Sequence, residues 1–279
     1  MKAYHEHRSY SSPLPLSTIR LRNFVFLAHW HNDVELIYVT EGSIRIGINA
    51  ETRILQAGDL AVCSSGDIHY YDSQGMDSEL VLIIFNPRLI GFPGGWPKDV
   101  RITSPFLEAA GQPPDSPAGE LSATAAKLFP RIRQESAEMP PHYEMIVTGL
   151  LHELCGTLLR HVASEPLDPR REKRLGTSRK AMQHALDYLD THYNSSITLE
   201  DLARQANMSV FHFSRFFKST TGMSCLSYLN NIRVNKAEEM ILATDKTILE
   251  IALECGFTNV RTFNRVFRQF RDCAPSSLR

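Results

Sequence analysis

LEDLARQANMSVFHFSRFFK, residues 199–218, recurs in altered form as ILEIALECGFTNVRTFNRVFR, residues 248–268, at an offset of 49 residues that becomes 50. Each copy places an alanine before a short turn and a second helical segment after it. Asn207 and Gly256 in these turns tolerate a left-handed backbone, and Ser209 and Thr258 are the predicted N-caps of the second helices. The repeat predicts an all-α domain of two helix-turn-helix motifs over residues 178–279.

The second helix of each motif is the predicted DNA-contacting element. With Phe213, Phe216 and Phe217 turned inward in the first copy, and the matching apolar residues in the second, the outer faces carry basic and polar side chains. Arginine pairs with guanine, asparagine with adenine, and apolar groups contact the thymine methyl. The candidate DNA-binding residues are Phe211, Ser214, Arg215 and Lys218 in the first copy and Val260, Arg261, Asn264, Arg265 and Arg268 in the second.

The charge distribution supports this assignment over the alternative of a merely solvated helix face. Residues 1–169 carry a net charge of −7 and residues 170–279 a net charge of +6, within a total of −1. A basic half indicates a polyanionic partner, here double-stranded DNA. Residues 224–244 form one predicted helix about 30 Å long, close to the ~34 Å turn of B-DNA, so this helix can hold the two motifs over successive major grooves.

Residues 178–279 resemble the C-terminal domain of the AraC family of bacterial transcription regulators. The resemblance rests on the pattern of Ile197, Leu199, Leu202, Ala203, Ser209, Phe213, Arg215, Phe217, Gly222, Tyr228, Leu229, Arg233 and Ala237, and on that of Ile248, Ile251, Ala252, Gly256, Phe257, Phe263, Arg265, Phe267, Arg268, Pro275 and Arg279. Asp272 stands where the family usually has glycine, and Leu278 where it usually has an aromatic residue.

The first half of the chain has the pattern of short β-strands. Ile44, Ile46 and Ile48 alternate on one face, and glycines separate the apolar runs, which is typical of a sandwich or barrel. We predict a barrel over about residues 20–90 and helices over about 118–163, with a break or kink near Pro130. A linker at 166–177 then separates an effector-binding and dimerisation domain, residues 1–165, from the DNA-binding domain.

Two stretches of the first half resemble the two cupin motifs. The first is His29-x-His31-x-x-x-Glu35-x-x-x-x-x-x-Gly42, and the second, further on, combines Gly58-Asp59 with Gly66-x-x-His69. The resemblance implies an N-terminal cupin-like β-barrel, or jelly roll, in a multidomain chain. His29, His31, Glu35 and His69 match the positions that hold a metal in cupin enzymes, so they are the metal candidates, for Fe, Mn, Zn or Ni. The candidate ligand-binding residues are His29, His31, Glu35, Tyr38 and His69.

Three roles for these residues remain open: a divalent metal site, a pocket that hydrogen-bonds a small polar ligand such as a sugar, and buried structural polar groups. We favour direct ligand binding with no required cofactor. The apolar stripe of Val147, Leu150, Leu151, Leu154, Leu158 and Val162 is either core or a dimer seam. Because helices after the barrel pair the subunits of similar proteins, we predict a homodimer.

The predicted function is sequence-specific transcription regulation in which the barrel senses a small-molecule effector, with RNA polymerase as a further partner. The alternatives are a cupin metalloenzyme fused to a DNA-binding module and a constitutive DNA-binding protein. No nucleophile triad or phosphate-binding glycine loop is present, so we predict no enzymatic activity. The five cysteines are scattered and the N-terminus is polar, without a signal peptide or a membrane-spanning run, so we expect a cytoplasmic protein.

Overall fold

The computed structural model describes residues 6, 10, 13–91, 96, 100–166 and 168–279. Contacts divide the chain into two compact units, formed mainly by Trp30–Gly176 and Thr177–Arg279. No helix among the described residues is long and apolar enough to cross a membrane.

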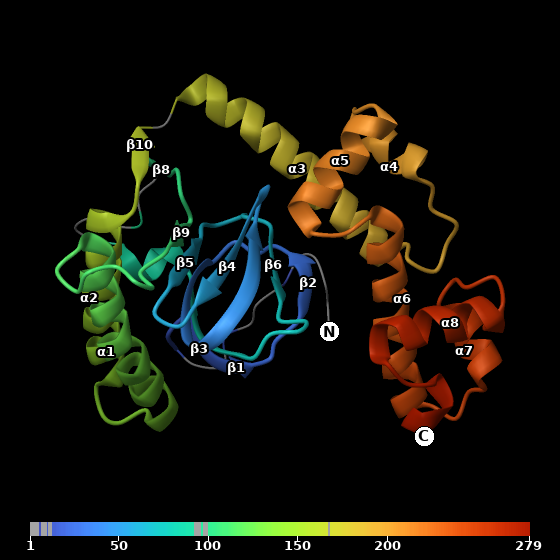
Figure 1. Cartoon of the computed structure of the whole chain (residues 1–279), viewed down its shortest axis with the longest axis horizontal. Helices are drawn as coiled ribbons and strands as arrows, with labels where there is room; N and C mark the ends of the chain where they lie inside the picture. The colour runs from blue at the N-terminus through green and yellow to red at the C-terminus, as the bar shows by residue number, and fades with distance from the viewer. Residues whose placement is uncertain (1–5, 7–9, 11–12, 92–95, 97–99, 167) are drawn as a thin grey trace. The chain divides into compact units, whose positions relative to one another are not determined.

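The N-terminal unit is built on an eight-stranded sheet, in which the path β1-β7-β3-β5-β9 is extended by β2, β4 and β6 (Figure 1). Strand β7 pairs antiparallel with β1, and β3 pairs antiparallel with β4, β5, β6 and β7, as does β5 with β9. Its strands are β1 (Leu16–Arg22), β2 (Phe26–His29), β3 (Val34–Ile48), β4 (Glu51–Gln56), β5 (Leu60–Cys63), β6 (His69–Asp72), β7 (Ser78–Phe85) and β9 (Phe106–Leu107). The sheet confirms the predicted barrel and extends beyond the expected 20–90 at both ends.

Strand β3 organises the barrel because its two halves pair with different partners. The first half pairs with β5 and β7, and the second half with β4 and β6. Alternate residues face two separate cores: Ile37 and Val39 lie inside the sheet, whereas Leu36 and Tyr38 face the helices. At Gly42 the backbone has φ +66°, and a Cβ there would overlap the carbonyl of Asp77, so the turn requires glycine.

Helices α1 (Pro117–Glu138) and α2 (Tyr143–His161) pack against each other and against one face of the sheet. Pro130 lies inside α1, which continues as one helix through that position instead of breaking there. The apolar stripe of α2 is buried in the same core as Leu36 and Leu128. Of the two roles predicted for this stripe, the structure therefore shows the intramolecular core. A 3-10 turn, η1 (Pro87–Ile90), and the small pair β8 (Val100–Ile102) with β10 (Ser164–Pro166) complete the unit.

Helix α3 (Pro169–Thr191) starts within the segment predicted as a linker, residues 166–177, so this connection is helical from Pro169 on. Arginine, lysine and glutamate have high helix propensity, which explains why a charged run continues as helix. The remaining elements of the C-terminal unit are α4 (Leu199–Gln205), α5 (Val210–Thr221), α6 (Cys225–Ala243), α7 (Ile248–Glu254), α8 (Val260–Arg271) and η2 (Pro275–Leu278). The unit is all-α, as predicted.

The turns of both motifs adopt the predicted left-handed backbone, with φ +52° at Asn207 and +81° at Gly256. Ser209 caps α5 by accepting a hydrogen bond from the amide of His212. The predicted cap Thr258 is wrong: Asn259 caps α8, because that helix begins one residue later, and its side chain accepts from the amide of Thr262. Asp272, where the AraC family usually has glycine, also has a positive φ of +54°, and aspartate is one of the few residues that tolerate this conformation.

Candidate functional site

The recognition helices α5 and α8 present the predicted outer faces. Phe213, Phe217, Phe263, Val266 and Phe267 are buried, whereas Phe216, which the sequence also placed inward, is only half-buried. Among the candidate DNA-binding residues, Phe211, Ser214, Arg215, Lys218, Arg261, Arg265 and Arg268 are exposed, and Val260 and Asn264 are half-buried. Both helices therefore offer a basic surface to DNA.

Helix α6 connects the two motifs and forms hydrogen bonds to the loop that precedes α4. Arg233 on α6 donates hydrogen bonds to the carbonyls of Tyr193 (2.7 Å) and Ser195 (2.9 Å). Its guanidinium also lies over the ring of Phe257, 5.7 Å from the centroid. Gly256 approaches the same loop, since a Cβ there would lie 2.8 Å from the backbone of Asn194. These contacts hold the turn of the second motif in place within the domain.

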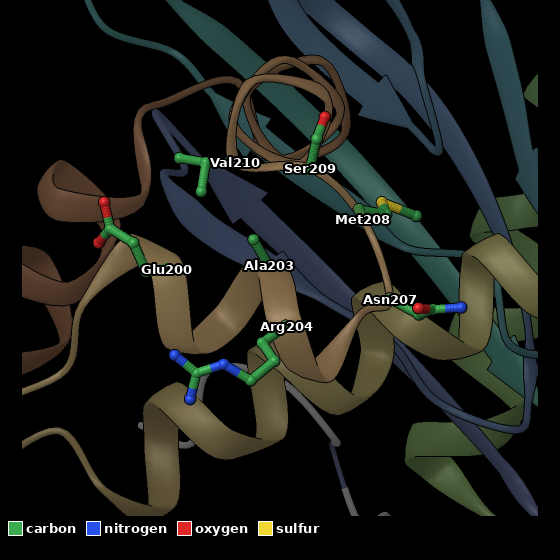
Figure 2. Close-up of a pocket in the computed structure, with 7 residues that line it drawn as sticks. All are labelled: Glu200, Ala203, Arg204, Asn207, Met208, Ser209 and Val210. Atoms are coloured by element: carbon green, nitrogen blue, oxygen red, sulfur yellow. The ribbon is translucent and has the colours of Figure 1, made fainter.

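A surface cavity of about 560 Å³ lies beside the turn of the first motif. Figure 2 shows that α4, the turn and the start of α5 line it. Glu200 and Arg204 bring opposite charges to its lining, and both side chains are exposed. Exposed groups of mixed charge do not select a ligand of one charge, so we treat this cavity as part of the surface beside the DNA-contacting helix.

The barrel contains a buried cluster of His29, His31, Glu35 and His69. One ligand atom from each residue lies within 4.8 Å of all the others. His29 ends β2, His31 lies in the following loop, Glu35 is on β3 and His69 begins β6. Each residue is at most 3% exposed. The structure thus brings together four of the five residues that the sequence proposed for ligand binding.

Every histidine of the cluster is oriented by a backbone carbonyl. The Nδ1 atoms of His29, His31 and His69 each lie 3.0 Å from a carbonyl oxygen, of Leu27, Asp33 and Asp67 respectively. Because a carbonyl oxygen only accepts, each Nδ1 carries the hydrogen and donates it. In a neutral imidazole with this tautomer, Nε2 keeps its lone pair. Donation of one ring N–H to a carbonyl is typical of histidines that bind a metal through the other ring nitrogen.

A positive species is needed at the centre of the cluster. Nε2 of His31 lies 2.9 Å, and Nε2 of His69 3.4 Å, from the same carboxylate oxygen, Oε2 of Glu35. Two lone-pair atoms at such distances repel each other unless a proton or a metal ion lies between them. Burial opposes ionisation of Glu35, but His69 and His31 nevertheless hold the pKa of its carboxyl well below the usual range. Burial likewise opposes the charge on His69, yet the carboxylate of Glu35 raises its pKa well above the ordinary value, so without a metal ion a proton occupies this place.

Tyr38 is the predicted ligand-binding residue that the structure places elsewhere. Its ring packs on Phe129 of α1, with centroids 5.4 Å apart, in the core between sheet and helices. The prediction was wrong because residues three apart on a strand point to opposite faces of the sheet. Tyr38 and Glu35 therefore lie on different faces.

Sequence reasoning missed two neighbours of the cluster. Tyr71 donates a hydrogen bond to Oε1 of Glu35, and Cys63 lies opposite Glu35 in the β3–β5 register and interacts with His69. Burial raises the pKa of the Cys63 thiol to about 11, so the thiol stays protonated near neutral pH. The two-residue spacing of His69 and Tyr71 on β6 was the available signal, since it places both on one face.

Both halves of the chain match models of known domains. A helix-turn-helix domain model matches residues 202–279 and a cupin domain model matches residues 22–85. An uncharacterized HTH-type transcriptional regulator, YdeC of Bacillus subtilis, is 23% identical over 290 residues, covering 100% of this chain and 96% of YdeC. The HTH-type transcriptional activator RhaR of Escherichia coli K12 is 26% identical over 256 residues, covering 91% of this chain and 87% of RhaR.

Among solved structures, an AraC-type transcriptional regulator from Chromobacterium violaceum is 24% identical, with a TM-score of 0.35, over 37% of this chain and 93% of that one. The domain matches, the full-length relatives and the basic recognition helices define a DNA-binding transcription regulator that joins a cupin barrel to two helix-turn-helix motifs. The chain carries an AraC-type helix-turn-helix domain behind a cupin domain, and its macromolecular partner is double-stranded DNA.

Proposed function

We propose that the barrel is the effector-sensing part of this regulator and that its sensing centre holds a divalent transition metal ion. His29, His31, Glu35 and His69 would hold the ion, because their three imidazole nitrogens and one carboxylate oxygen suit first-row metals. The observation that carries the proposal is the shared orientation of the histidines: their Nδ1 hydrogens are all donated to carbonyls, so Nε2 of each is the atom left for an ion once any proton on it is displaced. The metal-free pocket that the sequence favoured is the alternative to this proposal.

Neighbouring residues orient Glu35 toward the histidines and keep the cluster buried, which suits a bound ion. Tyr71 donates to Oε1 of Glu35 and leaves Oε2 directed at His31 and His69. Burial of all four side chains excludes water and strengthens electrostatic interactions. When bound, the metal would supply a Lewis-acid site for an oxygen or nitrogen donor of a small effector. Metal binding is expected to weaken as the pH falls, since the ion must displace any proton held between Glu35 and the imidazoles.

The barrel is expected to hold one metal ion per chain. The full-length chain, stripped with chelator and reloaded separately with Zn²⁺, Mn²⁺, Fe²⁺, Co²⁺ and Ni²⁺, is expected to retain one ion per chain for at least one of these metals. Its melting temperature should rise with the concentration of that metal, because a ligand that binds only the folded state stabilises it. Elemental analysis after gel filtration measures the stoichiometry, and His192→Gln, outside the cluster, is the matched control that should bind equally.

Binding by the control but not by His69→Gln would support the site, whereas absence of stoichiometric metal in the wild-type chain would overturn it. In that case a rise in melting temperature with sugars or organic acids would identify the barrel as a direct ligand pocket. Metal-dependent turnover of a small molecule would instead favour the metalloenzyme alternative. Metal-dependent transcription without turnover would establish sensing, since a regulator needs only differential binding between two states.

We also propose that two chains pair through the outer face of α2. Its exposed residues recur at spacings of three and four: Met145, Ile146, Gly149, Glu153, Gly156 and Arg160. A Cβ at Gly149 or Gly156 would meet no atom within 4 Å. Glycine inside a helix costs roughly 0.5–1 kcal/mol, which a closely approaching second backbone can offset. An antiparallel pair would place Gly149 against Gly156 of the second copy, and Arg160 near its Glu144.

This pairing predicts that Gly149→Arg shifts the full-length chain from dimer toward monomer. The arginine would separate the two helices while leaving the core face of α2 unchanged, so the fold should persist. Sedimentation velocity measures the change, and Gly176→Arg, at another helical glycine with open space around it, is the control. A Gly149→Arg chain that sediments like the wild type would exclude this face as the dimer contact.

A further inference from the structure

The outer face of α5 carries an aromatic–arginine pair that lies outside the core. Phe211 is 71% exposed, although an exposed phenylalanine leaves a large apolar area in water. The guanidinium of Arg215, one helical turn further on, lies over its ring, 5.6 Å from the centroid. This contact gives the face one apolar group and one bidentate hydrogen-bonding group, side by side.

The second motif differs at one member of this pair. The 50-residue offset aligns Arg215 with Arg265, both arginines, but it aligns Phe211 with Arg261. Arg261 and Arg265 are both exposed on α8, so the equivalent face there holds two guanidinium groups. The two recognition helices therefore present different chemistry at equivalent positions.

The chemistry of the pair matches two neighbouring bases. In the major groove only thymine presents an apolar methyl group, whereas guanine presents the O6 and N7 acceptors that arginine contacts with two hydrogen bonds. Successive bases are about 3.4 Å apart along the helix axis, and a ring and guanidinium 5.6 Å apart can reach both. We propose that α5 recognises a thymine next to a guanine, with Phe211 against the thymine 5-methyl group and Arg215 on the guanine edge.

The experiment removes the methyl group alone. The full-length chain selects duplexes from a randomised pool, and each thymine of the selected site is then replaced, one at a time, by deoxyuridine. Deoxyuridine keeps the base pair and its O4 acceptor but lacks the methyl group. At one position beside a guanine, the wild-type affinity should fall about fourfold, the effect of exposing one methyl-sized group. Phe211→Ala should bind the thymine and uracil duplexes equally, because the contacting ring is absent.

Arg261→Ala is the matched control, since it alters the equivalent position of α8. It should weaken binding overall but keep the dependence on the methyl group. Phe211→Leu retains an apolar side chain and should keep part of that dependence, which separates loss of contact from loss of folding. The proposal is overturned if no thymine methyl affects wild-type binding, or if Phe211→Ala remains as sensitive to the methyl group as the wild type. Both results are independent of whether the barrel holds a metal.

Discussion

A Glu35→Gln chain is expected to lose more than about a hundredfold in affinity for the barrel metal, because even loss of a residue that only orients a ligand costs about 10–100-fold. The amide keeps the size of the side chain but removes the charge that faces His31 and His69. Metal retained per chain after dialysis measures the effect, and the melting temperature without metal reports folding separately. Transcription from the target promoter should lose its response to metal or effector.

Glu41→Gln provides the matched control for this variant. Glu41 lies on the same strand, β3, but is exposed, so the same chemical change there should leave metal binding unchanged. A Glu35→Gln chain with wild-type metal content, ligand affinity and effector-dependent transcription would show that the cluster is a structural polar network. Glu35 would then serve only to pair the buried imidazoles within the barrel.

Alanine in place of Arg215 or Arg265 is expected to weaken binding to the selected DNA site by about 1–3 kcal/mol each, the range for an arginine paired with guanine. Both side chains are exposed on recognition helices, so their removal should not disturb the core. Binding is measured on the selected site and on random DNA at several salt concentrations. Loss of a base contact reduces the difference between the two DNAs, whereas loss of a phosphate contact weakens both alike and lowers the salt dependence.

Arg131→Ala makes the same change in charge at an exposed position of α1, outside the DNA-binding domain, and should leave both affinities unchanged. Equal losses on selected and random DNA for Arg215→Ala and Arg265→Ala would assign these arginines to the DNA backbone. No loss on either DNA would remove α5 and α8 from the interface altogether.

Local sequence features were sufficient to predict the double helix-turn-helix domain and the barrel. Helix formation in the motifs depends on local features that a sequence displays directly, such as Ser209 as a cap and the left-handed turn residues Asn207 and Gly256. The spacing of His29, His31, Glu35 and His69 was likewise sufficient to predict that these residues meet. Local prediction was wrong by one residue at the cap of α8, where Thr258 and Asn259 are both suitable and only the start of the helix decides between them.

Contacts between distant segments determine which residues surround the histidine–glutamate cluster of the barrel and which helix faces stay exposed. Tyr71 reaches Glu35 from 36 residues away, and the carbonyls that set the histidine tautomers are backbone groups, which leave no mark on sequence spacing. The stripe on α2 carries the same periodicity whether its partner is α1 or a second chain, and the fold assigned it to the core. Periodicity specifies that a face is apolar, but only the packed chain determines what covers it, because hydrophobic burial is non-directional.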